Sequence, residues 1–400
     1  MSEIIELAPG VHWIGARHPE LRMFDELLPT QFGTTYNSYL VQGRDKVALI
    51  DTVKAPFTEE FLAKVQALVP LEQIDLVVVN HTEPDHTGAL ERLLQLNPKI
   101  LVYCTRSGEN FLKQLIETPY QTHVVAEGEE LDLGGKTLRF LMAPNLHWPD
   151  TMFTHLPEAK ILFSCDAFGA HFCPEEGLYD DEVRDFSYDY RHYFDGIMRP
   201  FKDKIREAVA KVENLPLTLI CPSHGPILRR DPQAAIAGYK AMAAAPPASA
   251  KPRALLLTLS PHGSTRTMGK AVREGLEKAG LDVTERAVVG LEPTALRDEF
   301  ERADLLLIGT PTINRDAPPP VWGALALLST IHPKGKTAAV FGSYGWSGEA
   351  VKLVESRLTG LKYSLAAPGL CFRFKPTAAD IEACRQFGQT VAASLSGTGS

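Results

Sequence analysis

The stretch from His81 to His86 holds four potential metal ligands within six residues, directly after the apolar run Leu76–Val79. Imidazoles mixed with carboxylates suit iron or manganese as well as zinc. An apolar, β-favouring run followed by a polar loop indicates a strand whose carboxyl end opens into a site, as is usual in α/β proteins. The spacing therefore predicts a metal site at the mouth of a sheet. The four ligands are His81, Glu83, Asp85 and His86.

Three further candidate ligands, His147, Asp166 and His224, each stand at the end of another apolar run. Seven ligands are too many for one cation and suit two, which act together on one small substrate when a carboxylate bridges them. Asp166 is the candidate bridge. None of the seven is a cysteine, which disfavours a structural zinc site.

Composition narrows the class of protein. A chain of 400 residues is long enough for two domains. A net charge of −8 gives no electrostatic reason to bind nucleic acid or an anionic membrane surface. No apolar run is long enough for a membrane span, and the N-terminus lacks the pattern of a secretory signal, which predicts a cytoplasmic protein. The six cysteines form no Cys-x-x-Cys pair and are expected to be reduced thiols.

A stretch of small residues and prolines marks the predicted linker, residues 246–252, between a domain at 1–245 and a domain at 253–400. Short apolar runs recur before it and predict stacked sheets with helices outside. After it, the runs Ala254–Leu259, Leu305–Ile308 and Thr337–Phe341 alternate with helical patterns. This alternation predicts an α/β domain with a parallel, doubly wound sheet.

Three polar turns follow these three strands and are expected at one edge of the sheet. The first precedes the helical pattern Gly269–Gly280, where backbone N–H groups and hydroxyls can hold a phosphate. Alone, such a turn is as often an ordinary helix cap, and an aromatic in a turn can be a packing plug. The turn residues are Ser260, His262, Gly263, Ser264, Thr265 and Arg266, then Thr310, Pro311, Thr312, Ile313 and Asn314, then Ser343, Tyr344, Gly345, Trp346, Ser347 and Gly348.

On these motifs the chain resembles the flavodiiron proteins over nearly its whole length. Hydrolases of the metallo-β-lactamase group carry His-x-His-x-Asp-His, whereas flavodiiron proteins have Glu at the second position, as at Glu83. The resemblance implies an N-terminal metallo-β-lactamase-like αβ/βα sandwich and a C-terminal flavodoxin-like domain. It also implies FMN on the three turns, although His262 stands where many members carry Tyr.

The resemblance implies two non-heme iron ions. His81, Glu83, His147 and a bridging Asp166 would hold one iron, and Asp85, His86, Asp166 and His224 would hold the other. Members of the family differ in whether the imidazole at His86 coordinates. Three nearby candidates for proton donation or pocket shape are His171, Tyr193 and Trp346, for which plain packing is an equal alternative.

The implied activity is the reduction of oxygen to water, with nitric oxide reduction to nitrous oxide as a lesser activity. Stretches such as Phe341–Ala350 and Phe372–Pro376 are most similar to the photosynthetic, cyanobacterial-type branch, whose members carry an extra C-terminal flavin reductase domain. This chain ends at Ser400 without one, so it is expected to be a truncated core or to take electrons from an external reductase. A head-to-tail homodimer, or a dimer of dimers, is also implied by the resemblance.

Two alternative functions stay open. A zinc-dependent hydrolase of the metallo-β-lactamase type, fused to a flavodoxin-like domain, would act without a reductant. A non-catalytic electron carrier or redox sensor would bind FMN and leave the metal site empty or structural. Glu83 argues against the hydrolase, and the complete set of seven ligands argues against the carrier.

Overall fold

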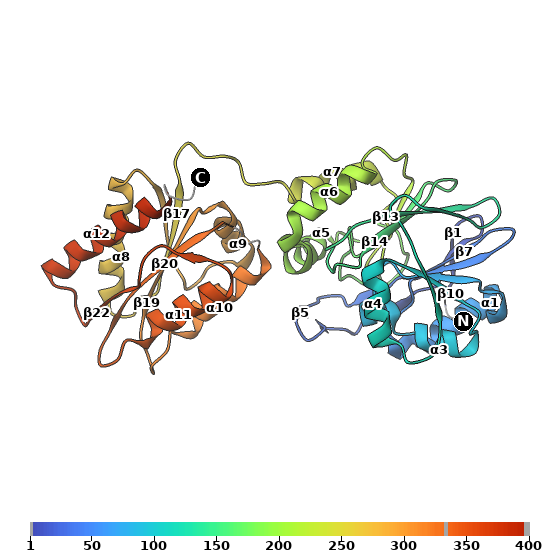
Figure 1. Ribbon diagram of the computed structural model, residues 1–400, viewed down its shortest axis with the longest axis horizontal. Coiled ribbons are helices and arrows are strands. Elements are labelled where there is room, and N and C mark those ends of the chain that lie inside the picture. The colour runs from blue at the N-terminus through green and yellow to red at the C-terminus, as the bar shows by residue number, and fades with distance from the viewer. Residues whose placement is uncertain (1–2, 332–334, 396–400) are drawn as a thin grey trace. The chain divides into compact units, whose positions relative to one another are not determined.

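The computed structural model describes residues 3–331 and 335–395. By its internal contacts the chain divides into two compact units, Met1–Ala244 and Ala245–Ser400, coloured blue to green and yellow to red in Figure 1. The last five residues of the second predicted domain lie outside the described residues. No helix among the described residues is long and apolar enough to cross a membrane.

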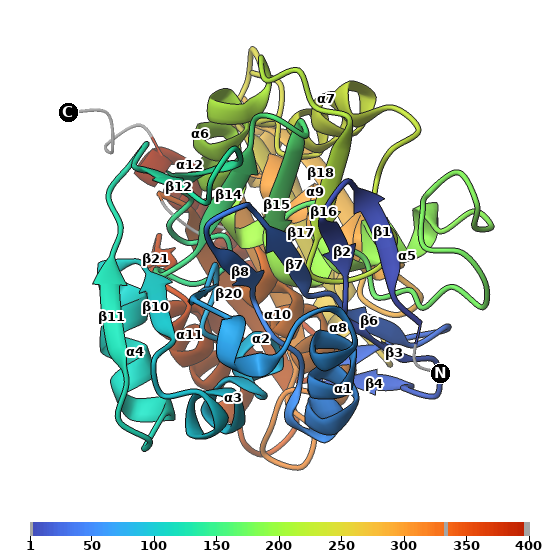
Figure 2. The same cartoon turned by 90° about the vertical axis from the view of Figure 1, so that its right-hand side faces the viewer.

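The N-terminal unit, which faces the viewer in Figure 2, contains two larger sheets. The first has seven strands in the order β1 (Ile5–Ala8), β2 (Val11–Trp13), β7 (Tyr39–Gln42), β8 (Val47–Ile50), β9 (Leu76–Val78), β10 (Leu101–Cys104) and β11 (Gln121–Val124). The second has five strands in the order β12 (Glu130–Asp132), β13 (Thr137–Met142), β14 (Met152–Leu156), β15 (Ile161–Cys165) and β16 (Leu219–Pro222).

Helices cover the outer faces of both sheets. One apolar core lies between the sheets, where side chains of β8 and β9 meet those of β13 and β15, and a further core lies outside each sheet. Strands buried on both faces read as continuous apolar runs, which is why these elements were recognisable in the sequence. The covering helices are α1 (Thr58–Leu68), α3 (Leu90–Leu96) and α4 (Arg106–Leu115) on one side, and α6 (Lys202–Val212) and α7 (Pro232–Met242) on the other.

Several short elements join these layers near the carboxyl ends of β9, β15 and β16. Helix α2 spans Pro84–Thr87, and α5 (Ser187–Tyr193) continues into a π-helical turn at Phe194–Met198. Single π-helical turns are rare in proteins, and those that occur often lie at functional sites. Two small antiparallel pairs complete the unit, β3 (Ala16–His18) with β6 (Thr34–Tyr36) and β4 (Met23–Phe24) with β5 (Leu28–Pro29).

The C-terminal unit is a parallel sheet with helices on both faces, as predicted. The strand order is β18 (Asp282–Ala287), β17 (Arg253–Thr258), β19 (Leu305–Pro311), β20 (Thr337–Tyr344) and β21 (Ser364–Leu365), and β22 (Leu370–Arg373) also pairs with β20. Helices α8 (Ser264–Lys278) and α12 (Ala378–Leu395) cover one face, and α9 (Pro293–Arg302), α10 (Pro319–Ala326) and α11 (Glu349–Gly360) cover the other.

Three predicted boundaries in this unit were wrong. Helix α8 begins at Ser264 rather than Gly269, because Gly263 adopts a left-handed conformation (φ 86°) that turns the chain directly into the helix. Strands β19 and β20 continue through Pro311 and Tyr344, residues that the sequence placed in turns. Their backbones pair with each other as far as Pro311 and Ser343, so pairing extends the strands beyond their apolar runs.

Candidate metal centre

All seven predicted ligands lie at one edge of the N-terminal unit. His81 follows β9, and α2 carries Asp85 and His86. Asp166 and His224 follow the parallel neighbours β15 and β16, so their carboxyl ends meet at the same edge. The loop between β13 and β14 supplies His147, and Glu83 precedes α2.

The Asp166 carboxylate divides the ligands into two groups. Its Oδ2 atom lies 3.7 Å from His81 Nε2 and 3.8 Å from His147 Nε2. Its Oδ1 atom lies 3.2 Å from His86 Nε2 and 3.5 Å from His224 Nε2. One carboxylate oxygen thus faces each pair of imidazoles, which is the arrangement expected of a bridging ligand.

Glu83 and Asp85 complete the two groups. Glu83 Oε2 lies 3.1 Å from His81 Nε2 and 3.0 Å from His147 Nε2. Asp85 lies on the other side, with Oδ2 3.1 Å from His224 Nε2 and Oδ1 3.4 Å from His86 Nε2. Among the described residues, two sets of three or more ligand atoms lie close enough to share an ion: His81, Glu83, His86 and Asp166, and Asp85, His86 and His224. His147 falls in neither set, although its Nε2 atom lies 3.0 Å from Glu83 Oε2.

The buried polar atoms of this cluster fit metal ions. Both Asp85 oxygens and His86 Nε2 are buried and lack a hydrogen-bond partner of proper geometry within the described part of the chain. Unsatisfied buried carboxylates and imidazoles are costly, and coordination to a cation removes that cost. The three carboxylates carry three negative charges, which two divalent cations offset. The donor set therefore fits a pair of metal ions.

The buried carboxylates of the cluster also favour positive charge beside them. Burial opposes charge on both His81 and Glu83. Hydrogen bonds to Asp150 and Glu83 nevertheless raise the pKa of His81 to about 10. Hydrogen bonds from His147 and His81 lower the pKa of Glu83 to about 2. Without cations, the carboxylates therefore hold imidazolium charge in the place that metal ions would take.

We expect metal binding to raise the melting temperature more at higher pH. In the metal-free protein the His81 pKa of about 10 lies above its usual 6.5, so its stabilising charge is complete below pH 6.5 and lost as pH rises toward 10. Metal binding needs the neutral ring and releases that proton, so metal affinity rises over the same range. Calorimetric melting of metal-free and zinc-loaded protein across this range measures the effect. A metal-induced shift that stays constant or shrinks with pH would contradict it.

Asp150 contacts the ring nitrogen of His81 that points away from the cluster, and no sequence motif indicated this contact. Its Oδ2 atom accepts hydrogen bonds from Thr82 N (2.7 Å) and Thr82 Oγ1 (2.8 Å), and lies 3.2 Å from His81 Nδ1. The carboxylate thereby orients the His81 ring so that Nε2 points into the cluster. A carboxylate behind a ligating imidazole fixes its tautomer and raises its basicity. Asp150 lies three residues after His147, but nothing in that spacing indicates contact with His81.

Replacing Asp150 by asparagine should lower metal affinity about 10-fold to 100-fold, the usual effect of losing such a partner. The side chain keeps its shape but loses the charge and one acceptor oxygen. Competition with a chromophoric chelator measures the affinity. Glu129→Gln is the matched control, because Glu129 also pairs with an imidazole, His123 (2.6 Å), but outside the cluster. Equal affinities for the two variants would contradict the assignment.

Two of the three predicted accessory residues lie beside the cluster. Burial holds the pKa of Tyr193 well above its usual value, so the phenol stays protonated and donates to Asp166 Oδ1 at 3.1 Å. Burial also holds the pKa of His171 well below its usual value, and this neutral ring contacts Thr34 Oγ1 through Nδ1 at 3.1 Å. Trp346 lies in the C-terminal unit with 77% of its surface exposed.

A small pocket of about 80 Å³ opens onto the cluster. Five of the seven candidate ligands line it, together with Tyr193 and Ile197. The rest of the lining comes from the β4–β5 hairpin, which no sequence motif marked as functional. A pocket of this volume admits a small molecule such as a diatomic gas.

The three predicted cofactor turns lie at the carboxyl edge of the C-terminal sheet. They are joined by a hydrogen bond between Thr265 Oγ1 and Ser343 Oγ (2.8 Å) and another from Thr312 N to Ser343 O (3.0 Å). Gly263 has no side chain to cap α8, and Ser260 Oγ accepts from Arg266 N (3.1 Å), which leaves the N–H groups of Ser264 and Thr265 at the helix start as the candidates for an anion. Ser347 Oγ is buried without a partner among the described residues, which fits a ligand at this edge.

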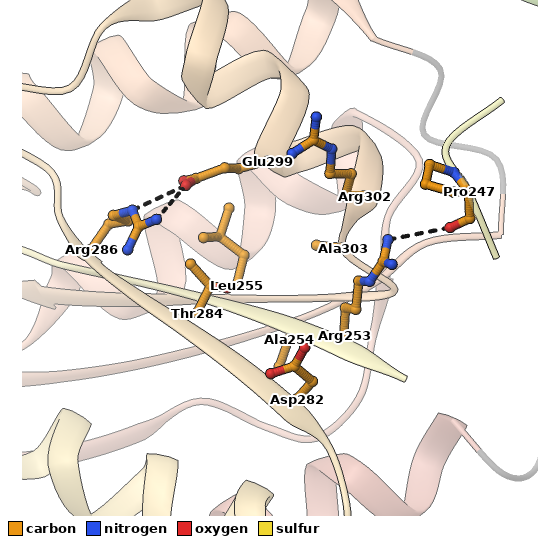
Figure 3. A pocket seen from close by; sticks show the side chains of 10 residues that line it. All are labelled: Pro247, Arg253, Ala254, Leu255, Asp282, Thr284, Arg286, Glu299, Arg302 and Ala303. Atoms are coloured by element: carbon orange, nitrogen blue, oxygen red, sulfur yellow. Dashed lines mark hydrogen bonds and ion pairs between the residues drawn. The ribbon is translucent and has the colours of Figure 1, made fainter. Parts of the chain in front are cut away.

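A separate groove of about 340 Å³ lies between α9, β17 and β18, away from these turns (Figure 3). Two of its arginines are engaged with the protein itself. Arg286 pairs with Glu299 at 2.9 Å, and Arg253 donates to the Pro247 carbonyl at 3.3 Å. We assign no ligand to this groove.

Comparison with known proteins agrees with the geometry. The profile of the ODP family beta lactamase matches residues 34–225, and the flavodoxin profile matches residues 256–388. The type A flavoprotein fprA of Rhodobacter capsulatus is 42% identical over 400 residues, covering 98% of this chain and 92% of that one. The chain belongs to the flavodiiron protein family. The flavo-diiron protein FprA2 of Clostridium acetobutylicum is 34% identical, covering 98% of this chain and 99% of its own.

Solved structures support the same assignment for this flavodiiron protein. The rubredoxin oxygen:oxidoreductase of Desulfovibrio gigas is 29% identical, with a TM-score of 0.73 and coverage of 99% of both chains. The flavodiiron protein of Giardia intestinalis is also 29% identical, with a TM-score of 0.71 and coverage of 99% of this chain and 98% of that one. The predicted fold class, a metallo-β-lactamase-like domain followed by a flavodoxin domain, is confirmed.

Proposed function

We propose that this protein is an oxidoreductase that reduces oxygen to water, and nitric oxide to nitrous oxide as a second activity, at a non-heme diiron site supplied with electrons by FMN. The observation that carries the proposal is the buried cluster in which the two oxygens of Asp166 face two separate pairs of imidazoles beside a small pocket. Relatives named as a nitric oxide reductase, 35% identical, and as an oxygen oxidoreductase support both substrates.

Each iron has a proposed ligand set. His81, Glu83, His147 and Asp166 would hold one ion, and Asp85, His86, Asp166 and His224 would hold the other. Glu83 supports iron over zinc, because a carboxylate in place of an imidazole adds hard oxygen donation and negative charge. The position of His86 Nε2, 3.2 Å from Asp166 Oδ1 and without a proper hydrogen-bond partner, supports coordination by this ring.

FMN would bind on the three turns of the C-terminal unit. Ser264 and Thr265, at the start of α8, would hold its phosphate, and the turns beginning at Thr310 and Ser343 would flank its ring. When bound, the cofactors supply electron transfer: the flavin takes up electrons in pairs or singly, and two ferrous ions bind and reduce a diatomic gas. The protein orients the ligands and keeps the Tyr193 phenol protonated, with its hydrogen bond directed at Asp166 Oδ1.

Several finer features belong to the same proposal. We place the domains at 1–245 and 253–400, joined by the linker 246–252, and the protein in the cytoplasm. Its electrons would come from a reductase, either a separate protein or a fused flavin reductase domain, and it would work as a head-to-tail homodimer or a dimer of dimers. Similarity to the cyanobacterial-type branch favours oxygen as the main substrate.

The test is to reduce the iron-analysed protein anaerobically through its flavin and add oxygen or nitric oxide in separate runs. Gas consumption followed with electrodes, without accumulating peroxide and with about two irons per chain, is the expected result. Slow flavin reoxidation with stoichiometric peroxide, in iron-loaded protein, would contradict the proposal. Ester or phosphodiester cleavage by zinc-loaded protein without a reductant would instead favour the hydrolase.

A further inference from the structure

The β4–β5 hairpin forms the outer wall of the metal-centre pocket. The Phe24 ring stacks on His171 with centroids 3.9 Å apart and meets the edge of His224 at 5.4 Å. Asp25 and Glu26 form the turn, both in the left-handed region with φ of 47° and 57°. This conformation is strained for residues other than glycine, asparagine and aspartate. Asp25 tolerates this conformation, so the conformational cost of the turn falls on Glu26.

Of the described side chains that line the pocket, only two can carry a proton and are not candidate ligands, namely Asp25 and Tyr193. Tyr193 is 2% exposed and already donates to Asp166, so it has no route of its own to bulk water. The Asp25 side chain is 39% exposed while it also lines the pocket. Asp25 is thus the titratable group that connects the pocket with solvent.

Lys54 holds Asp25 in this position. Its Nζ atom lies 2.8 Å from Asp25 Oδ1 and also lies over the Phe24 ring, 5.3 Å from the centroid. Lys54 comes from the segment after β8, so it ties the hairpin to the main sheet. Other titratable groups share this corner: Tyr36 of β6, whose pKa is raised by burial and by the charges of Asp85 and Asp25, and His18 of β3, whose pKa is lowered by burial and by Lys54.

We propose that Asp25 relays protons from bulk water into the pocket, held in place by Lys54. The inference rests on the proposed function, because reduction of one oxygen molecule to two waters consumes four electrons and four protons. The flavin and its external reductant supply the electrons. In each cycle the Asp25 carboxylate takes a proton from hydronium or a buffer acid in bulk solvent, which leaves water or the conjugate base there. The O–H bond of the protonated Asp25 then breaks as the proton passes to the substrate oxygen, and the carboxylate is restored. Nitric oxide reduction uses two protons for two molecules by the same route.

The kinetic test compares four variants in the iron- and FMN-loaded protein. Asp25→Asn should lower the rate of oxygen reduction about 100-fold and increase the solvent deuterium isotope effect, with unchanged iron content. Asp25→Glu should recover most of the rate. Asp25→Ala should be slow but recover with added formate, a small acid that can enter the space left by the carboxylate. Glu26→Gln is the control, since Glu26 lies in the same turn but does not line the pocket.

A second measurement needs no turnover. In zinc-loaded protein, a water-soluble carbodiimide should join Asp25 to Lys54 by an amide between Cγ and Nζ with loss of water, detected by peptide mass spectrometry. The pair Lys204 and Glu207, at 2.9 Å and with a lysine of similar exposure, is the internal reference. A cross-link at the reference pair without one at Asp25 would show that Asp25 is not held open to solvent beside Lys54, and would overturn the proposal.

The outcomes separate this inference from the function on which it rests. If the loaded wild-type protein consumes neither gas, the proposed function fails. If the wild type is active and Asp25→Asn keeps its rate and isotope effect, the relay is overturned and the function stands. A slow Asp25→Asn variant, with no recovery by Asp25→Glu or by formate in Asp25→Ala, would mean that Asp25 only maintains the hairpin, and would also overturn the relay.

Discussion

Asp166→Ala should abolish the consumption of oxygen and nitric oxide, lowering both rates by more than about 100-fold, the upper range for loss of a residue that merely supports a ligand. Each oxygen of this carboxylate faces a different pair of imidazoles, so one substitution removes a ligand from both metal positions. The remaining cluster would have lost one of its three negative charges and the bridge between the two ions. Gas electrodes measure the loss of gas consumption, and metal analysis measures the loss of bound iron.

Two flavin measurements on the Asp166→Ala protein and one further variant serve as controls. FMN content and flavin reduction should match those of the wild type, because Asp166 belongs to the N-terminal unit and the flavodoxin profile matches residues 256–388. Asp45→Ala, which removes an exposed aspartate from a turn of the same unit, should leave iron content and rate unchanged. Gas reduction that survived Asp166→Ala would rule out the proposed diiron centre.

Ser264→Glu should weaken FMN binding by about 100-fold or more. Ser264 is the first residue of α8, where the N–H groups at the helix start and the positive end of the helix dipole favour an anion. A carboxylate placed there would occupy and repel the phosphate position. Titration of flavin-free protein with FMN, followed by flavin fluorescence, measures the affinity. The rate of gas reduction should fall in proportion to the loss of bound FMN, because FMN is the proposed electron donor to the metal centre.

Ser264→Ala separates charge repulsion from the loss of a hydroxyl. Removing one hydrogen bond to a charged group costs about 1.5–3 kcal/mol, so this variant should bind FMN about 10-fold to 100-fold more weakly than the wild type. Iron content should be normal in both variants. If Ser264→Glu bound FMN as tightly as the wild type, the phosphate would lie elsewhere and the cofactor assignment at this turn would be wrong.

The seven candidate metal ligands could be collected from the sequence for a physical reason. Parallel strands buried on both faces are continuous apolar runs, and the residues after them necessarily gather at one sheet edge. His81, Asp166 and His224 each follow such a run, so residue type and position relative to the strands were enough to collect the seven ligands. The alternation of strands and helices after residue 253 likewise predicted the doubly wound sheet.

The local sequence pattern predicted element boundaries less well where strand pairing or turn geometry determines them. The start of α8 at Ser264 follows from the left-handed conformation of Gly263, and the ends of β19 and β20 follow from their mutual hydrogen bonds. Neither feature changes the apolar periodicity from which the elements were predicted. The error displaced the start of α8 by five residues, so Ser264 and Thr265, predicted in the turn before the helix, lie in its first turn.

From its amino acids alone, the chain specified which side chains would meet at the sheet edge and that they suit two cations, because both follow from residue type and strand order. Only the tertiary structure decided that the two oxygens of Asp166 face different imidazoles, that Asp150 contacts His81 Nδ1, and that Asp25 lines the pocket. Asp150 and His81 are 69 positions apart, and the hairpin has no apolar periodicity of its own. Such contacts depend on how separate layers pack, and no local sequence pattern encodes that packing.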